Sequence, residues 1–215
     1  MNIGILGSGA VGRVLARAFT AEGHTVMLGT RTTSRPDLAL LVQENPGTRL
    51  GSFGEAAAFG ELLVLAVAGA AAEPVIAMAG TANFRNKILI DTTNPIAAAP
   101  PQNGVLSFFT SPNESLMERI QLLVPEARVV KAFNSVGNAV MYRPSFKEGR
   151  PTMFICGNDD NAKKTVTALL DAFGFDAEDM GKVQSARAIE PLCILWCIPG
   201  FIRNQWNHAF RLLQQ

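Results

Sequence analysis

The chain has 215 residues, of which 48% are hydrophobic, so it is long enough to bury one sizeable core with a small appendage. Its 19 Lys and Arg residues against 18 Asp and Glu residues leave a formal net charge of +1, which argues against a nucleic-acid-binding surface. Glycines interrupt the apolar N-terminus, and the most hydrophobic stretch, Ile189–Ile202, contains Glu190 and two prolines, so we expect neither a signal peptide nor a membrane-spanning helix. These features predict a soluble, cytoplasmic protein.

The first elements predict a nucleotide-binding turn. Ile3–Leu6 has the apolar composition of a buried strand, and the residues after Ala10 have apolar positions at helical spacing up to Gly23. Between them lies G-x-G-x-x-G, whose glycines allow a tight turn, a close approach of the backbone to a pyrophosphate, and close packing of the helix on the strand. The residues expected to bind the phosphates are Gly7, Ser8, Gly9, Ala10, Val11 and Gly12.

Strands and helices then alternate along the chain. We expect strands over residues 24–30, 48–53, 61–68, 86–94, 127–133 and 151–157. We expect helices over residues 35–47, 55–60, 71–80, 114–124, the start of 134–150, 158–174 and 184–213, with Asn113 and either Asn158 or Asp159 as N-caps. This order predicts an α/β protein of the Rossmann type, a doubly wound and mostly parallel sheet with a short helical C-terminal extension. We assign residues 1–157 to the dinucleotide-binding core and residues 158–215 to a smaller C-terminal part of one compact chain.

The end of the second strand favours NADP over NAD. NAD-binding folds place an acidic residue there to hold the ribose hydroxyls, but no acid occurs between Glu22 and Asp37. The segment instead offers hydroxyl and guanidinium groups, which bind phosphate, from Thr30, Arg31, Thr32, Thr33 and Arg35. A polar surface loop with ordinary arginines is the alternative interpretation.

Several segments together resemble one family of enzymes. The segments are "NIGILGSGAVGRVLARAF", "GHTVMLGTR", "VVKAFNSV", "FICGNDDNAKKTV" and "ARAIEPL", spread over essentially the whole chain. They are similar to the NADPH-dependent deazaflavin oxidoreductases, also called coenzyme F-420-dependent NADP reductases, and to the cytosolic NADPH/flavin domain of the six-transmembrane metalloreductases. The resemblance implies an oxidoreductase that transfers a hydride between NADPH and F-420 or a flavin.

The resemblance also implies where the two rings lie. It places the nicotinamide near Ala66, Val67, Ala68, Asn94 and Pro95. It places the second ring near Phe133, Asn134 and Ser135, with Arg187–Leu192 closing that side, although Phe133 is equally compatible with a strand end that packs in the core. Hydride passes directly between two such rings, so no catalytic side chain is required. Lys131 is the nearest proton donor, and a structural role fits it equally well.

The sequence is also compatible with other functions. A module that senses NADP(H) without turnover would use the same loop, whereas a hydroxyacid dehydrogenase or imine reductase needs a large helical domain after Asp159 for which few residues are left. Cys193 and Cys197 lack a third metal ligand nearby and are read as buried thiols, so no metal site is expected. The apolar run Leu192–Ile202 predicts a homodimer contact, with a last core helix as the alternative.

Overall fold

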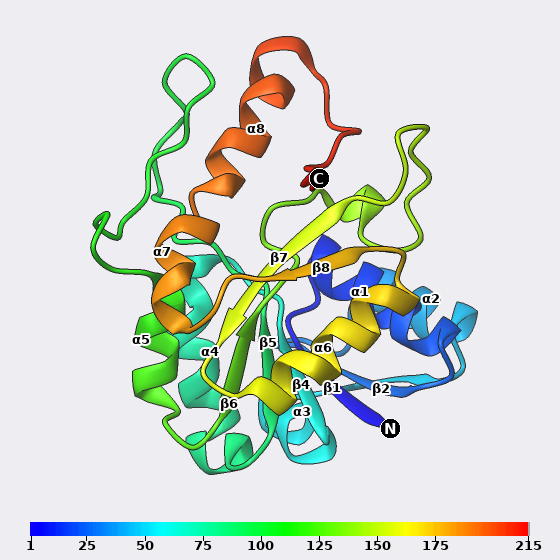
Figure 1. Ribbon diagram of the computed structural model, residues 1–215. Coiled ribbons are helices and arrows are strands. Elements are labelled where there is room, and N and C mark those ends of the chain that lie inside the picture. The colour runs from blue at the N-terminus through cyan, green and yellow to red at the C-terminus, as the bar shows by residue number, and fades with distance from the viewer. Residues whose placement is uncertain (215) are drawn as a thin grey trace.

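A computed structural model describes residues 1–214, in which eight strands form one sheet in the order β3-β2-β1-β4-β5-β6-β7-β8 (Figure 1). The first six strands pair in parallel, β7 runs antiparallel to β6, and β8 runs parallel to β7. The strands are β1 Asn2–Leu6, β2 Thr25–Gly29, β3 Thr48–Gly51, β4 Leu62–Leu65, β5 Ile88–Asp91, β6 Arg128–Lys131, β7 Thr152–Gly157 and β8 Asp176–Asp179. The strand order reverses at β1, so the carboxyl ends of β1 and β4 form the switch point where such sheets bind ligands. The predicted Rossmann-type fold is confirmed.

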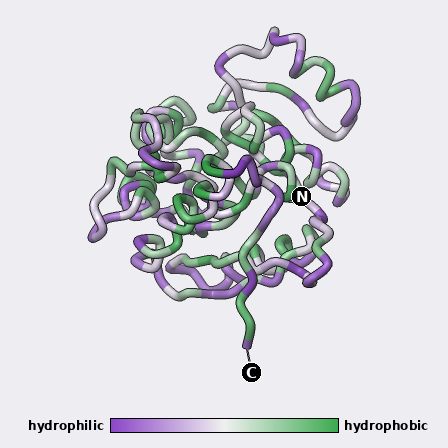
Figure 2. The backbone as a smooth tube through the Cα atoms, turned by 90° about the horizontal axis from the view of Figure 1, so that it is seen from above, coloured by the Kyte–Doolittle hydropathy of each residue, from purple (hydrophilic) through white to green (hydrophobic). Residues whose placement is uncertain are grey.

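Helices cover both faces of this sheet. They are α1 Ala10–Ala21, α2 Pro36–Glu44, α3 Phe53–Phe59, α4 Ala72–Ala79, α5 Leu116–Leu123, α6 Asp160–Ala172, α7 Ala186–Ile189 and α8 Leu192–Arg203. Helices α1, α2 and α6 pack with one face of the sheet in a first apolar core, and α3, α4, α5 and α7 pack with the other face in a second core. Seen from above, hydrophobic segments lie through the centre of the molecule, and hydrophilic ones are frequent in the loops along its outline (Figure 2).

The structure moves two of the expected boundaries. Strand β8 follows residue 157 but belongs to the same sheet, α6 packs in the first core and α7 in the second, so α8 and the segment after it are what extends beyond the two cores. The N-cap of α5 is Ser115 and not Asn113, because Ser115 and Glu118 form a capping box, with the Ser115 hydroxyl accepting from the Glu118 amide at 3.1 Å. Asp159 caps α6, as one of the two predicted alternatives.

Two further expectations were wrong. Residues 134–150 contain only a short 3-10 turn, Asn138–Val140, because Phe133 has a left-handed φ of 62° that turns the chain out of β6. Gly137 then lies against the Trp196 ring of α8, so tertiary contact and not helical hydrogen bonding fixes this segment. Strand β8 was not predicted, because three residues of its sequence "DAED" are acidic, as suits an edge strand, and only Ala177 packs against the first core.

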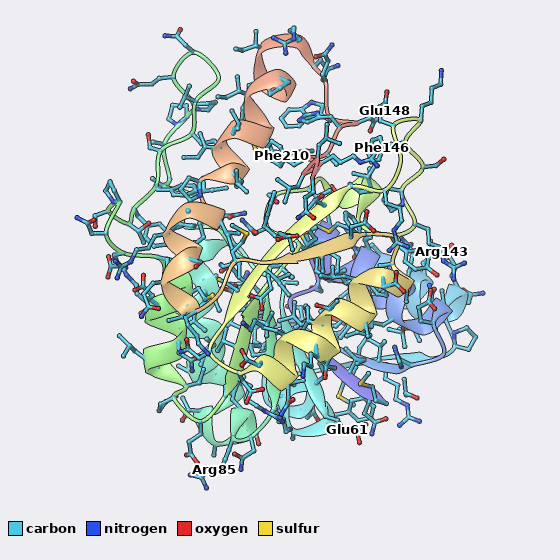
Figure 3. The ribbon with its side chains drawn as sticks, in the orientation of Figure 1. Glu61, Arg85, Arg143, Phe146, Glu148 and Phe210 are labelled. Atoms are coloured by element: carbon cyan, nitrogen blue, oxygen red, sulfur yellow. The ribbon has the colours of Figure 1, made fainter. Side chains whose placement is uncertain are left out.

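The C-terminal segment was expected to be helical to residue 213, but α8 ends at Arg203. Asn204 is left-handed, and Trp206 packs back on α8 at ring distances of 5.3 Å from Phe201 and 5.7 Å from Trp196. The segment then returns to β7, where the amide of Thr152 donates to the Phe210 carbonyl at 2.8 Å. Figure 3 places Phe210 beside Phe146 and Glu148, where this segment meets the 143–150 loop.

A buried ion triad joins the end of the sheet to the C-terminal helices. The Lys131 ammonium lies 2.6 Å from an Asp91 carboxylate oxygen and 2.9 Å from a Glu190 oxygen, and it donates to the Thr93 carbonyl at 2.8 Å. The Glu190 carboxylate also accepts from the amides of Leu116 and Met117, in the first turn of α5, at 3.0 Å each. The triad therefore fixes α5 and the α7–α8 junction at the carboxyl ends of β5 and β6.

This triad also bears on the apolar C-terminal run. By length and composition alone, the helical run Val183–Arg203 is able to cross a membrane, and 33% of its most apolar window is buried. The run is divided into a 3-10 turn, α7 and α8, and its Glu190 is paired with a lysine of the sheet. That buried carboxylate ties the run to the folded body.

Replacing Lys131 by Met should lower the free energy of unfolding by about 3–5 kcal/mol, because two buried carboxylates would lose their counter-ion. Arg85→Met is the control, since Arg85 and its partner Glu126 are 61% and 57% exposed and the loss should be about 1 kcal/mol or less. Burial would lower the pKa of Lys131, but Asp91 and Glu190 outweigh it and raise the pKa above 10.5. The stabilisation is therefore complete below pH 10.5 and lost as the pH rises beyond it. Urea unfolding as a function of pH measures both effects, and equal losses in the two variants would contradict the assignment.

Candidate dinucleotide-binding site

The three glycines of the turn after β1 have different tasks. Gly7 has a φ of 128°, and a Cβ there would collide with the carbonyl of Ala66, the residue after β4. A Cβ on Gly12 would collide with the Gly7 carbonyl, so both glycines are required for the helix to lie on the strand. A Cβ on Gly9 would meet nothing within 4 Å. Gly9 is therefore not needed by the fold, and its Cα faces open space at the start of α1.

The N-terminus of α1 is open to an anion. Its N-cap is Gly9, which offers no side-chain cap, and the first turn contains no acidic residue. The first amides of this 12-residue helix and its positive dipole end thus point to the same space as Gly9. This arrangement binds phosphate groups in many folds.

A cavity of about 670 Å³ begins at this helix end. It runs along the carboxyl ends of β2, β1 and β4 and is bounded on one side by α4. Predicted residues that line it are Gly7, Ser8, Gly9, Thr30, Arg31, Arg35, Ala66, Val67 and Ala68. Thr32, one of the hydroxyl residues expected near the phosphate, also lines it, and the lining residues that were not predicted are Phe53, Ala70, Ala71, Pro74, Val75 and Met78. Ala10, Val11 and Gly12 lie behind the loop, in the first turn of α1.

The end of the cavity beside β2 is polar and cationic. Thr30 is buried, and its hydroxyl accepts from the Ser8 hydroxyl at 2.9 Å, which ties the end of β2 to the glycine loop. Arg35 reaches the same Ser8 oxygen at 3.4 Å. Arg31 is exposed and makes no ion pair with any other residue from 1 to 214. A guanidinium without a counter-ion at the mouth of a cavity is suited to an anionic ligand.

Comparison with known proteins shows the family of this chain. The family described as "NADP oxidoreductase coenzyme F420-dependent" matches residues 2–95. The crystal structure of a protein from Arthrobacter sp. FB24, named as a candidate F420-dependent NADP reductase, is 33% identical, covers all of both chains and superposes with a TM-score of 0.91. The chain belongs to the coenzyme F-420-dependent NADP oxidoreductase family.

Two curated relatives extend this comparison. Metalloreductase STEAP3 of Rattus norvegicus is 31% identical over 210 residues, which are 94% of this chain and 39% of that protein. The F420-dependent NADP reductase of Methanocaldococcus jannaschii is 31% identical over 110 residues, which are 51% of this chain and 48% of that protein. The matches thus span about two fifths and about half of the length of these relatives.

In this member of the F-420-dependent NADP oxidoreductase family, Asn94 and Asn134 lie beyond the carboxyl end of β5 and fill the space there. The Asn94 side-chain amide donates to the Asn134 carbonyl at 2.8 Å, and the Asn134 amide donates to the Ile189 carbonyl at 2.9 Å. Gly69 lies so close to the Asn94 carbonyl that a Cβ would collide with it. Ala66–Ala68 line the cavity, whereas Asn94, Pro95, Asn134 and Ser135 do not. Asn94 and the α7 end adjoin Ala66–Ala68 through Gly69 and form with them a wall that continues past the cavity, with Pro95 buried behind it.

Phe133 does not belong to this wall. Its side chain is 2% exposed and packs in the first core, with ring distances of 5.9 Å to Phe173 and 6.1 Å to Phe175. The left-handed backbone of Phe133 directs the ring under α6, so the core alternative is correct and the predicted ring contact was wrong. Asn134 and Ser135 are also buried, and the Asn134 side chain holds Asn94 and α7 in place.

Two buried titratable groups, Lys131 and Cys156, lie near this wall, and the surroundings of both keep them from reacting. Lys131, the proton-donor candidate, is fully buried in its ion triad. Burial raises the pKa of the Cys156 thiol to about 12, so this thiol stays protonated at neutral pH. Neither group supplies a nucleophile or a general acid.

The apolar lining was missed by sequence reasoning. Phe53 begins α3, and Pro74, Val75 and Met78 belong to α4 and face the cavity across from Arg31. Met78 is 53% exposed on the outward face of α4, which also carries the exposed Pro74, and these apolar residues on an exposed helix face were the available signal. A cavity with one apolar and one cationic wall fits a flat ring next to a phosphate.

Gly9→Val should abolish binding of NADPH, or weaken it at least about tenfold, and leave the fold intact. The reason is that the branched side chain would fill the open space at the α1 N-terminus without meeting any neighbour. Gly12→Val is the contrasting variant and should lower the melting temperature, because its side chain collides with Gly7. Calorimetric titration and thermal melting measure the two effects. Unchanged NADPH affinity in Gly9→Val would refute the phosphate assignment.

Proposed function

We propose that this protein is an NADP-dependent oxidoreductase that transfers a hydride between NADPH and a deazaflavin such as coenzyme F-420, or a flavin. The observation that carries the proposal is one cavity that joins an anion-binding helix end to a cationic strand end. The relatives support it, because one is named as an F420-dependent NADP reductase and another as a metalloreductase.

The residues present fit NADP(H). The amides at the start of α1, next to the empty space at Gly9, would hold the pyrophosphate. Arg31, with Arg35 and the Thr30 hydroxyl beside it, would hold the 2′-phosphate that distinguishes NADP from NAD. The apolar wall of α4 and Phe53 leaves room for a planar ring.

The dihydronicotinamide, when bound, supplies the hydride, and the deazaflavin or flavin ring accepts it. The task of the protein is to orient the two rings and to exclude water. Ala66–Ala68 and Asn94 offer small side chains and backbone at the wall where the nicotinamide is proposed to lie, and the Asn94–Asn134 hydrogen bonds make that wall rigid. No protein group needs to donate or accept a proton, in keeping with the buried states of Lys131 and Cys156.

The proposal predicts loss of NADPH absorbance at 340 nm when the protein is mixed anaerobically with NADPH and either F-420 or FMN. Arg31→Ala should weaken NADPH binding by about 10- to 100-fold and leave NADH nearly unchanged, because a hydrogen bond to a charged group contributes about 1.5–3 kcal/mol.

The control is Arg49→Ala, since Arg49 lies on the outer strand β3 and does not line the cavity. Binding of NADPH without turnover with either acceptor would favour the sensing module instead. Equal weakening of NADPH and NADH in Arg31→Ala would place the 2′-phosphate elsewhere.

We also propose that a second copy of the chain covers α8, so that the protein is a cytoplasmic homodimer. Leu195, Phe201 and Ile202 of α8 are 55%, 45% and 56% exposed, and this helix projects from the body of the molecule (Figure 1). Exposed apolar patches of this kind usually mark interfaces.

Light scattering at micromolar concentration should give the mass of a dimer, and the double variant Leu195→Asp with Ile202→Asp should give a monomer. Leu122→Asp is the control, because Leu122 is 81% exposed on α5, away from α8. A monomer mass for the unmodified protein would contradict the dimer.

A further inference from the structure

Asp37, the second residue of α2, joins two arginines that come from different elements. Arg13 of α1 lies 2.7 Å from one Asp37 carboxylate oxygen through its Nη1. Arg35 lies 2.6 Å from the same oxygen through Nη2 and 3.1 Å from the other oxygen through Nε. One carboxylate thus serves two guanidinium groups.

Only one of these three side chains lines the cavity. Arg35 does so and reaches the Ser8 hydroxyl oxygen of the glycine loop at 3.4 Å, whereas Arg13 and Asp37 lie behind it. The hydrogen bonds from Arg35, together with the charges of Arg35 and Arg13, hold the pKa of Asp37 below its usual value. Asp37 is therefore a full negative charge at neutral pH, immediately beside a site proposed to bind a phosphate.

A second arginine beside Asp37 is needed for two net positive charges at this end of the cavity. With Arg35 and Asp37 alone, the carboxylate would cancel the guanidinium, and Arg31 would be the one remaining positive charge at this end of the cavity. Arg13 adds a positive charge on the same oxygen of Asp37. The three arginines and one carboxylate then sum to +2, which matches a phosphate monoester that carries −1.5 to −2 at neutral pH.

We propose that Arg13 is a specificity-determining residue that acts through Asp37. By neutralising that carboxylate, Arg13 leaves Arg35 available to the 2′-phosphate of NADP(H). This inference rests on the proposed NADP binding and adds a residue that does not itself face the cofactor. It also accounts for how an acidic residue is tolerated so close to the end of β2.

The test is a double-mutant cycle measured by calorimetric titration of the free protein, with no turnover required. In Arg13→Ala, the exposed charge of Asp37 should weaken NADPH and 2′,5′-ADP about three- to tenfold at low salt and leave NADH and 5′-AMP unchanged. Raising the ionic strength should shrink the effect. Adding Asp37→Asn to Arg13→Ala should restore the affinity for NADPH, because the carboxylate that Arg13 neutralised is then absent.

Arg17→Ala is the matched control. Arg17 lies one turn further along α1 and bridges to Glu44 at the other end of α2 at 3.4 Å, away from the cavity. This variant should keep the affinity for both cofactors, whereas a purely structural role of the α1–α2 bridges predicts losses in both Arg13→Ala and Arg17→Ala.

The outcomes separate this inference from the proposed function. Unmodified protein that fails to prefer NADPH over NADH would overturn both. Unmodified protein with that preference, together with an Arg13→Ala variant that weakens NADPH and NADH alike, would overturn the inference only. A double variant that stays as weak as Arg13→Ala would overturn it as well.

Discussion

The buried pairing of Lys131 with Asp91 and Glu190 is the constraint on which the second half of the molecule depends. Two carboxylates and an ammonium leave water together, and such a burial is tolerated only where each charge is paired with an opposite one. Asp91 and Lys131 end neighbouring strands, and Glu190 comes from the junction of α7 and α8. The triad therefore fixes the position at which the C-terminal helices cross the end of the sheet. Thr93 and the wall that starts at Asn94 are held by the same lysine.

The cavity divides its tasks between backbone and side chains. At the glycine loop, the fold needs Gly7 and Gly12, while Gly9 only keeps space open. At the end of β2, the proposed selection between NADP and NAD would rest on side-chain charge, and Asp37 is held between two guanidinium groups. Backbone amides recognise a phosphate shared by all dinucleotides, whereas long charged side chains discriminate between them. In the proposed site, the shared and the selective functions therefore lie side by side in one cavity, joined by the hydrogen bond between the Ser8 and Thr30 hydroxyls.

Local sequence signals succeeded where the relevant forces are local. The strand composition of Ile3–Leu6 and the apolar spacing of α1 predicted the first unit, because burial on both sides of a parallel sheet requires those residue types. The capping box at Ser115 was also local, yet it was overlooked in favour of Asn113. By contrast, the polar strand β8 forms because β7 offers it an edge, and nothing within its four residues signals that pairing.

The sequence by itself determined the α/β class, the strand–loop–helix unit and the cationic end of β2, because these depend on periodicity and on residues close together in the chain. Tertiary structure decided the burial of Phe133, the turn at Asn204 that returns the chain to β7, and the meeting of Arg13 with Asp37. Each of these involves partners 24 or more residues apart or a backbone conformation fixed by packing on another element. A residue pattern records which side chains must be buried or charged, but only the folded chain sets which of them meet.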